Sequence, residues 1–198
     1  IDVMTELAKD LGVEIEFVPA DWKTLLNGVV SGAYHLTGSA SISPSRAKAA
    51  GYSTSYFSLA TVPLILSKNA RQYKDWNDLN QSGVTVAATL GTTQEQQIKP
   101  YFPKASHKIV DAPARDFQEV LAGRADAHIT SNVEAYKLVE KYSNMMIVPV
   151  SAPQSPTPVA MLMPQTDQVW INYVNTWIAL KQKRGFFDEL GRKWKLSN

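Results

Sequence analysis

The sequence predicts an α/β fold in which strands and helices alternate along the chain. Short apolar runs alternate with segments whose apolar residues recur at helical spacing, which is typical of parallel α/β units. The 198 residues, 44% of them hydrophobic, are enough to bury the core of one large or two small domains. No internal repeat or low-complexity segment interrupts the pattern, so neither a repeat array nor a disordered tail is indicated.

The first third of the chain predicts two strands and three helices. The chain opens on an amphipathic helix, IDVMTELAKDLG, and a strand is expected at VEIEFVPA, residues 13–20. A helix follows over residues 21–31 with Asp21 as its cap, and a second strand is expected at YHLTGSA, residues 34–40. The next helix should begin at Ser43 with Pro44 at its first helical position.

The remaining segments continue the alternation and suggest two lobes. Strands are expected at 84–89, 127–130 and 145–150, and helices at 92–99, 114–122 and 132–142. Two longer apolar segments, at 60–68 and 158–164, are candidate crossings between lobes, and the second closes the Pro/Ser-rich stretch 150–158. We therefore expect one lobe from residues 1–62 plus 162–198 and another from residues 63–161.

A long helix should end the chain. Val169, Tyr173, Trp177 and Leu180 recur at helical spacing, and we expect this stripe to pack into the core. Gly185 should break the helix before a second short one.

The helix starts are the features that point to a site. Thr92 with Glu95, and Ser131 with Glu134, have the spacing of a capping box. In an open parallel sheet such turns meet at the carboxyl ends of the strands, and helix N-termini there offer unpaired N–H groups and a partial positive charge. A cap is an ordinary need of every helix, so each turn alone indicates only structure. Together with Arg46 they favour an anion site.

Composition excludes several other classes. The net charge is +2, from 20 basic and 18 acidic side chains without a basic stripe, so nucleic acid is not an expected partner. The absence of cysteine excludes disulfides, thiolate nucleophiles and Cys-based zinc sites. His35, His107 and His128 have no metal-binding spacing, LGTTQ lacks the lysine of a phosphate loop, and we expect neither a metal nor a cofactor. His128 lies in an apolar strand and is expected in the core. No apolar run is long enough to span a bilayer, and the first residues do not form a signal peptide.

Three segments together resemble a known family. GSASISPSRAKAAGYSTSY, then LGTTQE, then EVLAGRADAHITSNVEA resemble the periplasmic solute-binding proteins of the polar amino acid type. The resemblance implies the type II periplasmic binding protein fold: two lobes, each a mostly parallel sheet flanked by helices, joined by two crossover strands around a ligand cleft. It also implies a periplasmic monomer that captures a small-molecule carboxylate or amino-acid-like ligand and passes it to the permease of an ABC transporter.

The resemblance also implies roles for individual residues. Arg46 falls on the arginine that grips the ligand's carboxylate, a geometry that suits a planar guanidinium. Trp22 falls on the aromatic position that stacks on the ligand, and Ser39 and Ser41 fall on contact positions. The carboxylate-binding helix N-terminus of the second lobe corresponds to Thr92 and Thr93.

Two departures from the family pattern stand out. The strand and loop with which family members begin are missing, so we expect the first lobe to lack roughly one βα unit. Amino acid binders also carry an aspartate for the ligand's ammonium group where this chain has Ser131, a neutral hydroxyl. That change favours a carboxylate ligand without an ammonium group, or another ligand orientation. Glu134 is the candidate replacement, although its default role is the capping box.

Glu134 also opens an alternative. TSNVEA resembles a segment of the cyclohexadienyl (prephenate/arogenate) dehydratases, carbon–oxygen lyases on this fold with a glutamate at that position. Arg46, Thr92 and Thr93 would hold the substrate's carboxylates, and Glu134 would be the general acid. These enzymes keep an aspartate where Ser131 stands, so we favour the binding protein and retain the lyase as the alternative.

Overall fold

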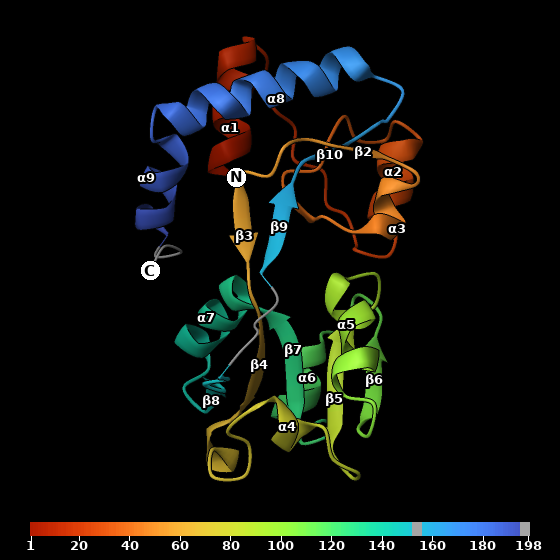
Figure 1. Ribbon diagram of the computed structural model, residues 1–198, viewed down its shortest axis with the longest axis vertical. Coiled ribbons are helices and arrows are strands. Elements are labelled where there is room, and N and C mark those ends of the chain that lie inside the picture. Colours follow the sequence, from red (N-terminus) through yellow and green to blue (C-terminus); the bar gives the residue numbers. More distant parts are fainter. Residues whose placement is uncertain (152–155, 195–198) are drawn as a thin grey trace. The chain divides into compact units, whose positions relative to one another are not determined.

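The computed structural model describes residues 1–151 and 156–194. They form two compact units, unit 1 from Ile1–Ser58 with Pro158–Asn198 and unit 2 from Leu59–Thr157. Figure 1 labels their helices and strands. The lobe boundaries expected at residues 62 and 162 stay a prediction. Residues 152–155 of the Pro/Ser-rich stretch, and 195–198, lie outside the described residues.

Unit 2 is built on a five-stranded mixed sheet of order β6-β5-β7-β4-β8. Its strands are β4 (Thr61–Leu66), β5 (Thr85–Thr89), β6 (Ser106–Val110), β7 (Ala127–Ser131) and β8 (Met145–Ile147). Strand β5 runs parallel to β6 and β7, whereas β4 runs antiparallel to β7 and β8. The strands expected at 60–68, 84–89, 127–130 and 145–150 are thus present. Strand β6 was not predicted, because this edge strand is largely exposed and lacks an apolar run.

The two faces of this sheet carry separate cores. Because side chains alternate along a strand, Val86 and Ala88 of β5 pack with Ile98 of α5, while Ala87 packs with Phe117 of α6. Helices α4 (Trp76–Leu79) and α5 (Thr93–Tyr101) therefore cover one face, and α6 (Asp116–Leu121) and α7 (Asn132–Lys141) the other. The same alternation in β7 places Ala127 and Ile129 towards α5. The residues between them, including His128, face α6 and α7.

Unit 1 has smaller sheets and more helix. Its strands are β1 (Ala40–Ser41), β2 (Gly51–Tyr52), β3 (Phe57–Leu59), β9 (Thr157–Ala160) and β10 (Leu162–Met163), in the orders β1-β9-β3 and β10-β2. Its helices are α1 (Asp2–Leu11), α2 (Leu25–Val30), α3 (Pro44–Ala47), α8 (Gln168–Lys183) and α9 (Phe186–Lys193). The pairs β1 with β9 and β10 with β2 are antiparallel, so the mostly parallel sheet expected in both lobes is not what these strands form.

The strand expected at residues 13–20 is the clearest correction. The whole segment is exposed and non-regular, with Phe17 52% exposed. Alternation of apolar and polar residues marks a strand only where a neighbouring strand can pair with it, and no described residue does so here. The strand expected at 34–40 likewise shrinks to β1, Ala40–Ser41.

The helix expected over 21–31 begins later than the sequence indicated. It covers only α2, Leu25–Val30, with Thr24 as the N-cap residue and no side-chain cap. Asp21 does not cap it through its side chain, because its main-chain oxygen instead accepts from the N–H groups of Thr24 and Leu25 in a preceding turn.

Helix α8 turns a different face to the core from the one expected. Ile171, Val174, Trp177 and Ile178 are buried. From the predicted stripe only Trp177 belongs to this face, whereas Val169 is 80% exposed and Leu180 is also exposed. The helical spacing of apolar residues predicted the helix correctly, but a different apolar face of that helix packs into the core.

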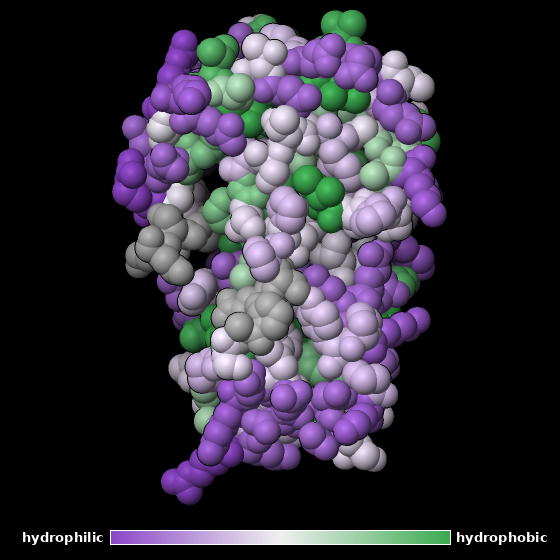
Figure 2. Space-filling model, viewed as in Figure 1, coloured by the Kyte–Doolittle hydropathy of each residue, from purple (hydrophilic) through white to green (hydrophobic). Residues whose placement is uncertain are grey.

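Most of the visible surface is polar. On the face shown in Figure 2, hydrophobic side chains form separate small areas rather than one continuous patch. No helix within the described ranges is long and apolar enough to cross a membrane.

Candidate functional site

Arg46 is the cationic residue of the candidate site in unit 1. Ser43 caps helix α3, its Oγ accepting from the N–H of Arg46 at 3.4 Å, and Pro44 is the first helical residue, as the sequence predicted. The guanidinium donates through Nη1 to the main-chain oxygen of Ser41 at 3.1 Å. Its Cζ lies 5.5 Å from the ring centroid of Trp22. These contacts hold a charged side chain that is only 7% exposed.

A second hydrogen-bond donor fixes the main-chain oxygen that Arg46 uses. The hydroxyl of Tyr52 donates to the same Ser41 oxygen at 2.9 Å and accepts from the N–H of Ser43 at 3.3 Å. The hydroxyl of Tyr52 therefore connects strand β2 to the turn before α3 through two hydrogen bonds. Tyr52 was not predicted as part of the site, and no sequence spacing marks it.

The other candidates of unit 1 lie on the same stretch of chain or beside it. Trp22 is 43% exposed and lies outside any helix or strand. Ser39 is exposed and stands two residues before Ser41, whose side chain is half-buried. The structure thus brings Trp22, Ser41 and Arg46 together.

In unit 2, Thr92 caps helix α5. Its Oγ1 accepts from the N–H of Glu95 at 3.2 Å and donates to the oxygen of Thr89, the last residue of β5, at 2.6 Å. The carboxylate of Glu95 accepts from the N–H of Gly91 at 2.6 Å rather than from that of Thr92. The Glu95 side chain therefore binds the N–H of the residue before the cap residue, whereas in a regular capping box it binds the N–H of the cap residue itself.

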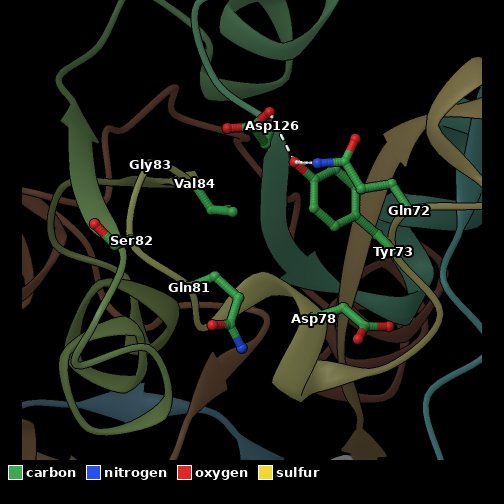
Figure 3. A pocket seen from close by; sticks show the side chains of 8 residues that line it. All are labelled: Gln72, Tyr73, Asp78, Gln81, Ser82, Gly83, Val84 and Asp126. Carbon is green, nitrogen blue, oxygen red and sulfur yellow. Dashed lines mark hydrogen bonds between the residues drawn. The ribbon is translucent and has the colours of Figure 1, made fainter.

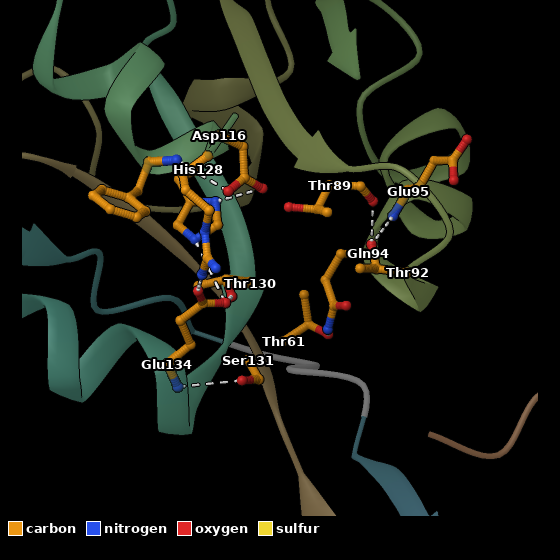
Figure 4. A network of polar contacts seen from close by, with 12 residues as sticks. Thr61, Thr89, Thr92, Gln94, Glu95, Asp116, His128, Thr130, Ser131 and Glu134 are labelled. Carbon is orange, nitrogen blue, oxygen red and sulfur yellow. Dashed lines mark hydrogen bonds and ion pairs between the residues drawn. The ribbon is translucent and has the colours of Figure 1, made fainter. Parts of the chain in front are cut away.

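A chain of polar contacts ties this helix to the first residue of β4. Thr93 is buried and donates to Gln94, whose amide lies 3.4 Å from Oγ1 of Thr61. Thr61 in turn donates to Gln97 at 2.8 Å and stands opposite Ser131 in the sheet. Figure 4 shows Thr61, Gln94 and Ser131 near the ends of the strands. The α5 and α7 starts therefore meet at the carboxyl ends of β5 and β7, as expected for parallel strands.

Only the Ser131 half of the expected capping box is present at the start of α7. Ser131 caps α7, its Oγ accepting from the N–H of Glu134 at 3.2 Å. The Glu134 carboxylate does not return to Ser131: Oε2 accepts from Thr130 at 2.6 Å and Oε1 from Arg115 at 2.8 Å. The reciprocal half of the box is absent because these two stronger partners take both oxygens.

Comparisons with known proteins identify the family and the fold of the chain. The model of the bacterial extracellular solute-binding proteins, family 3, matches residues 1–197. The chain belongs to this family. A crystal structure described as the ancestral amino acid-binding protein AncCDT-1, a precursor of cyclohexadienyl dehydratase, shares 33% identity at a TM-score of 0.86. The match covers 98% of this chain and 82% of that one.

Two curated relatives are more distant in sequence. The cyclohexadienyl dehydratase of Pseudomonas aeruginosa is 24% identical over 195 residues, and the L-cystine-binding protein TcyJ of Escherichia coli K12 is 28% identical over 196. Each match covers 98% of this chain and 72% of the relative. The family 3 membership and the two-lobed α/β fold predicted from the sequence are confirmed by these matches. The assignment of single residues to ligand binding stays a proposal.

Sequence reasoning missed the residues that surround Glu134 in this family 3 protein. Arg115, just before α6, and Thr130, on β7, both donate to the Glu134 carboxylate of α7, and Asp116 follows Arg115 in the chain. Two separate segments thus meet the first turn of α7. In the sequence, residues 115–116 and 130 are marked only by their position near the ends of predicted helices and strands. The sequence does not say which of these ends lie side by side in the fold, because that depends on the order of the strands in the sheet.

A pocket of about 480 Å³ in unit 2 lies away from these residues (Figure 3). It is lined by Gln72, Tyr73, Asp78, Gln81, Ser82, Gly83, Val84 and Asp126, so it opens at the amino ends of β5 and β7. Asp126 accepts from the hydroxyl of Tyr73 at 3.0 Å and from the N–H of Thr85 at 2.8 Å. Burial, with a smaller effect of Asp126, raises the pKa of Tyr73 to about 12. Asp126 thus serves the fold, and we do not assign the ligand to this pocket.

Within residues 1–151 and 156–194, no group of three or more His, Asp or Glu residues is placed to hold an ion.

Proposed function

We propose that this family 3 protein captures a small amino-acid-like carboxylate outside the cytoplasm and delivers it to an ABC transporter. Arg46 binds the ligand's carboxylate, and Trp22 packs on the ligand beside it. Ser39 and Ser41 contribute polar contacts from the same lobe. Thr92 and Thr93, with the N-terminus of α5, contribute the second lobe's contacts to the same anionic group.

The geometry of Arg46 is the observation that carries the proposal. An arginine that is 7% exposed, stacked on Trp22 and bonded to a main-chain oxygen, has little conformational freedom left to lose on binding. A guanidinium fixed in this way suits bidentate binding of a carboxylate.

Glu134 supplies the charge that Ser131 lacks. With Oε1 accepting from Arg115 and Oε2 from Thr130, both oxygens act as acceptors, and the carboxylate lies at the same strand ends as Ser131. We infer that a cationic group of the ligand approaches Glu134 while Ser131 contributes a hydroxyl. The ligand is therefore amino-acid-like rather than a simple carboxylate.

The partner and the location follow from the same proposal. Members of the family are extracellular solute-binding proteins, and we infer a periplasmic location, with a transporter permease that recognises the ligand-bound form. We further propose that the protein acts as a monomer.

Titration calorimetry of the Arg46→Ala variant with L-glutamine, L-cystine and L-arginine tests the proposal. We expect the affinity for the amino acid that binds to fall at least about 30-fold, because the carboxylate loses a charged partner held in a dry site. Lys48→Ala removes an exposed cation at the end of the same helix and serves as the control, with unchanged affinity. Equal affinity in wild type and Arg46→Ala would contradict the proposed role of Arg46.

One observation favours a second candidate, a cyclohexadienyl dehydratase. Glu134 occupies the first turn of α7, and the P. aeruginosa dehydratase is among the relatives. A general acid must hold a proton to donate, whereas both Glu134 oxygens accept hydrogen bonds here. Incubation with prephenate or arogenate would give an absorbing aromatic product, lost in Glu134→Gln, if the protein were this enzyme. We expect no turnover.

A further inference from the structure

A buried pair of titratable residues lies beneath Glu134 and has no part in the proposed function. His128 stands on β7, in the middle of the five-stranded sheet, and is 1% exposed. Asp116, the first residue of α6, is 2% exposed. Nδ1 of His128 lies 3.0 Å from Oδ2 of Asp116, and Figure 4 shows the two side chains against one another. Burying such a pair costs free energy that an apolar residue would not cost, so the pair calls for an explanation.

Asp116 fixes the state of the imidazole. Its other oxygen, Oδ1, accepts from the N–H of Phe117 at 3.0 Å. Although burial opposes it, the contacts with His128, Thr89 and Phe117 hold the pKa of Asp116 below its ordinary value. Asp116 is therefore an anion at neutral pH, and its carboxylate stabilises a hydrogen on the ring nitrogen 3.0 Å away, although the contact does not have the geometry of a regular hydrogen bond. We therefore assign the hydrogen of the neutral ring to Nδ1.

The second nitrogen of His128 faces Glu134. Nε2 lies 4.0 Å from Oε2 of Glu134 and has no hydrogen-bond partner within the described part of the chain. Without a hydrogen, Nε2 can only accept a hydrogen bond, as can the carboxylate oxygen of Glu134, so the two atoms do not attract one another. The carboxylate oxygen accepts from the hydroxyl of Thr130 instead. With a hydrogen, Nε2 becomes a charged donor and competes for the same oxygen.

Few other charges act on this nitrogen. Helix α6 contributes Asp116, with Arg115 just before it, and α7 contributes Glu134. The register partners of His128 are apolar, Leu64 on β4 and Ala87 on β5. The four side chains together, those of Arg115, Asp116, His128 and Glu134, carry a net charge of −1 when His128 is neutral and of zero when His128 is cationic.

We propose that Asp116 and His128 are positioning residues for the ligand's cationic group, acting through Glu134. While Nε2 lacks a hydrogen, the Glu134 carboxylate, whose Oε1 is paired with Arg115, offers Oε2 to the ligand's cationic group. When Nε2 gains one, it draws that carboxylate towards the sheet and cancels its charge. The inference deepens the proposed function and rests on the assignment of Glu134 to the ligand site.

The first test needs no ligand. Ring ¹⁵N spectra of the full chain across pH 5 to 8 report the tautomer and protonation of the histidines, and His128→Asn identifies the signals of His128. We expect the Nδ1-protonated tautomer in the neutral ring. We also expect Glu134→Gln to shift the ¹⁵N resonance of Nε2, because the carboxylate 4.0 Å from that nitrogen is lost. Glu140→Gln, an exposed change on the same helix, is the control. An Nε2 resonance that Glu134→Gln leaves in place, or an Nε2-protonated neutral ring, overturns the proposal.

The second test measures affinity for L-arginine, whose own groups do not change charge between pH 5.5 and 8. We expect wild type to bind at least tenfold more weakly at pH 5.5 than at pH 8, and His128→Asn, whose amide can still donate to Asp116, to lose this dependence. Binding by wild type that does not vary with pH overturns the positioning role and leaves the proposed function in place. Absence of L-arginine binding together with the expected ¹⁵N result contradicts the ligand class and supports the coupling of His128 to Glu134.

Discussion

The candidate residues of the two units are supported in very different ways. In unit 2, Thr92 and Ser131 follow strands of a five-stranded sheet, and each caps a helix of nine or ten residues. In unit 1, Ser41 and Arg46 lie on a two-residue strand and a four-residue helix, and the same unit contains the exposed segment 13–20. The position of the first set is determined by extensive packing, and that of the second by a few specific hydrogen bonds. The two sets of residues should therefore be sensitive to different substitutions.

The largest effect should come from the core beneath the candidate residues of unit 2. Ile129 of β7 is 1% exposed and packs on the side of the sheet that α5 covers, so Ile129→Ala leaves a cavity that costs about 2–5 kcal/mol of the free energy of unfolding. Urea denaturation of the full chain measures this loss. A cost below about 1 kcal/mol would mean that unit 2 is no more tightly packed around its site than unit 1.

Asp116→Asn should have the next largest effect, and it should depend on pH. The native pKa of Asp116 is lowered, so its ionised form stabilises the fold above the unfolded value of about 3.9, and this contribution is lost as pH falls through the lower native value. At pH 7 we expect a loss of about 1–3 kcal/mol, because the buried imidazole loses its charged partner. Thermal unfolding of both proteins from pH 2 to pH 7 should show the difference narrowing only in acid. A difference in stability between the two proteins that stays constant from pH 7 to pH 2 would contradict the prediction.

Two cap substitutions sharpen the comparison between the units. Ser131→Ala removes the acceptor for the N–H of Glu134 and should cost about 1 kcal/mol. Asp21→Ala, at the position that the sequence indicated as a cap, should cost less than about 0.5 kcal/mol because the side chain caps no helix. Urea denaturation compares the two, and equal costs would show that Asp21 has a role that its hydrogen bonds do not reveal.

The smallest effect should follow a change in the exposed segment. Phe17 is exposed in a stretch without secondary structure, so Phe17→Ser should change the free energy of unfolding by no more than about 0.5 kcal/mol. A loss comparable to that of Ile129→Ala would show that residues 13–20 pack against other parts of the protein in solution.

What could be predicted from the sequence follows the same division. Strands β4, β5 and β7 and the starts of α3, α5 and α7 are local properties, set by apolar runs and by cap residues such as Ser43 and Thr92. Residues 13–20 have the pattern of a strand, but pairing depends on a neighbour that no local pattern specifies. Arg115 and Asp116 escaped prediction for a related reason, since only the sheet order places them beside Glu134 and His128.

The oxygen that holds Arg46 belongs to the main chain of Ser41, and Tyr52 shares it. Any residue at position 41 would offer the same oxygen, so the side chain there is free to vary without disturbing the arginine. Under the proposed function, recognition of the ligand's carboxylate by Arg46 and selection among ligand side chains would therefore be encoded separately along this stretch. A lineage built on this arrangement can change the compound it recognises by substitutions at such positions while keeping the arginine in place.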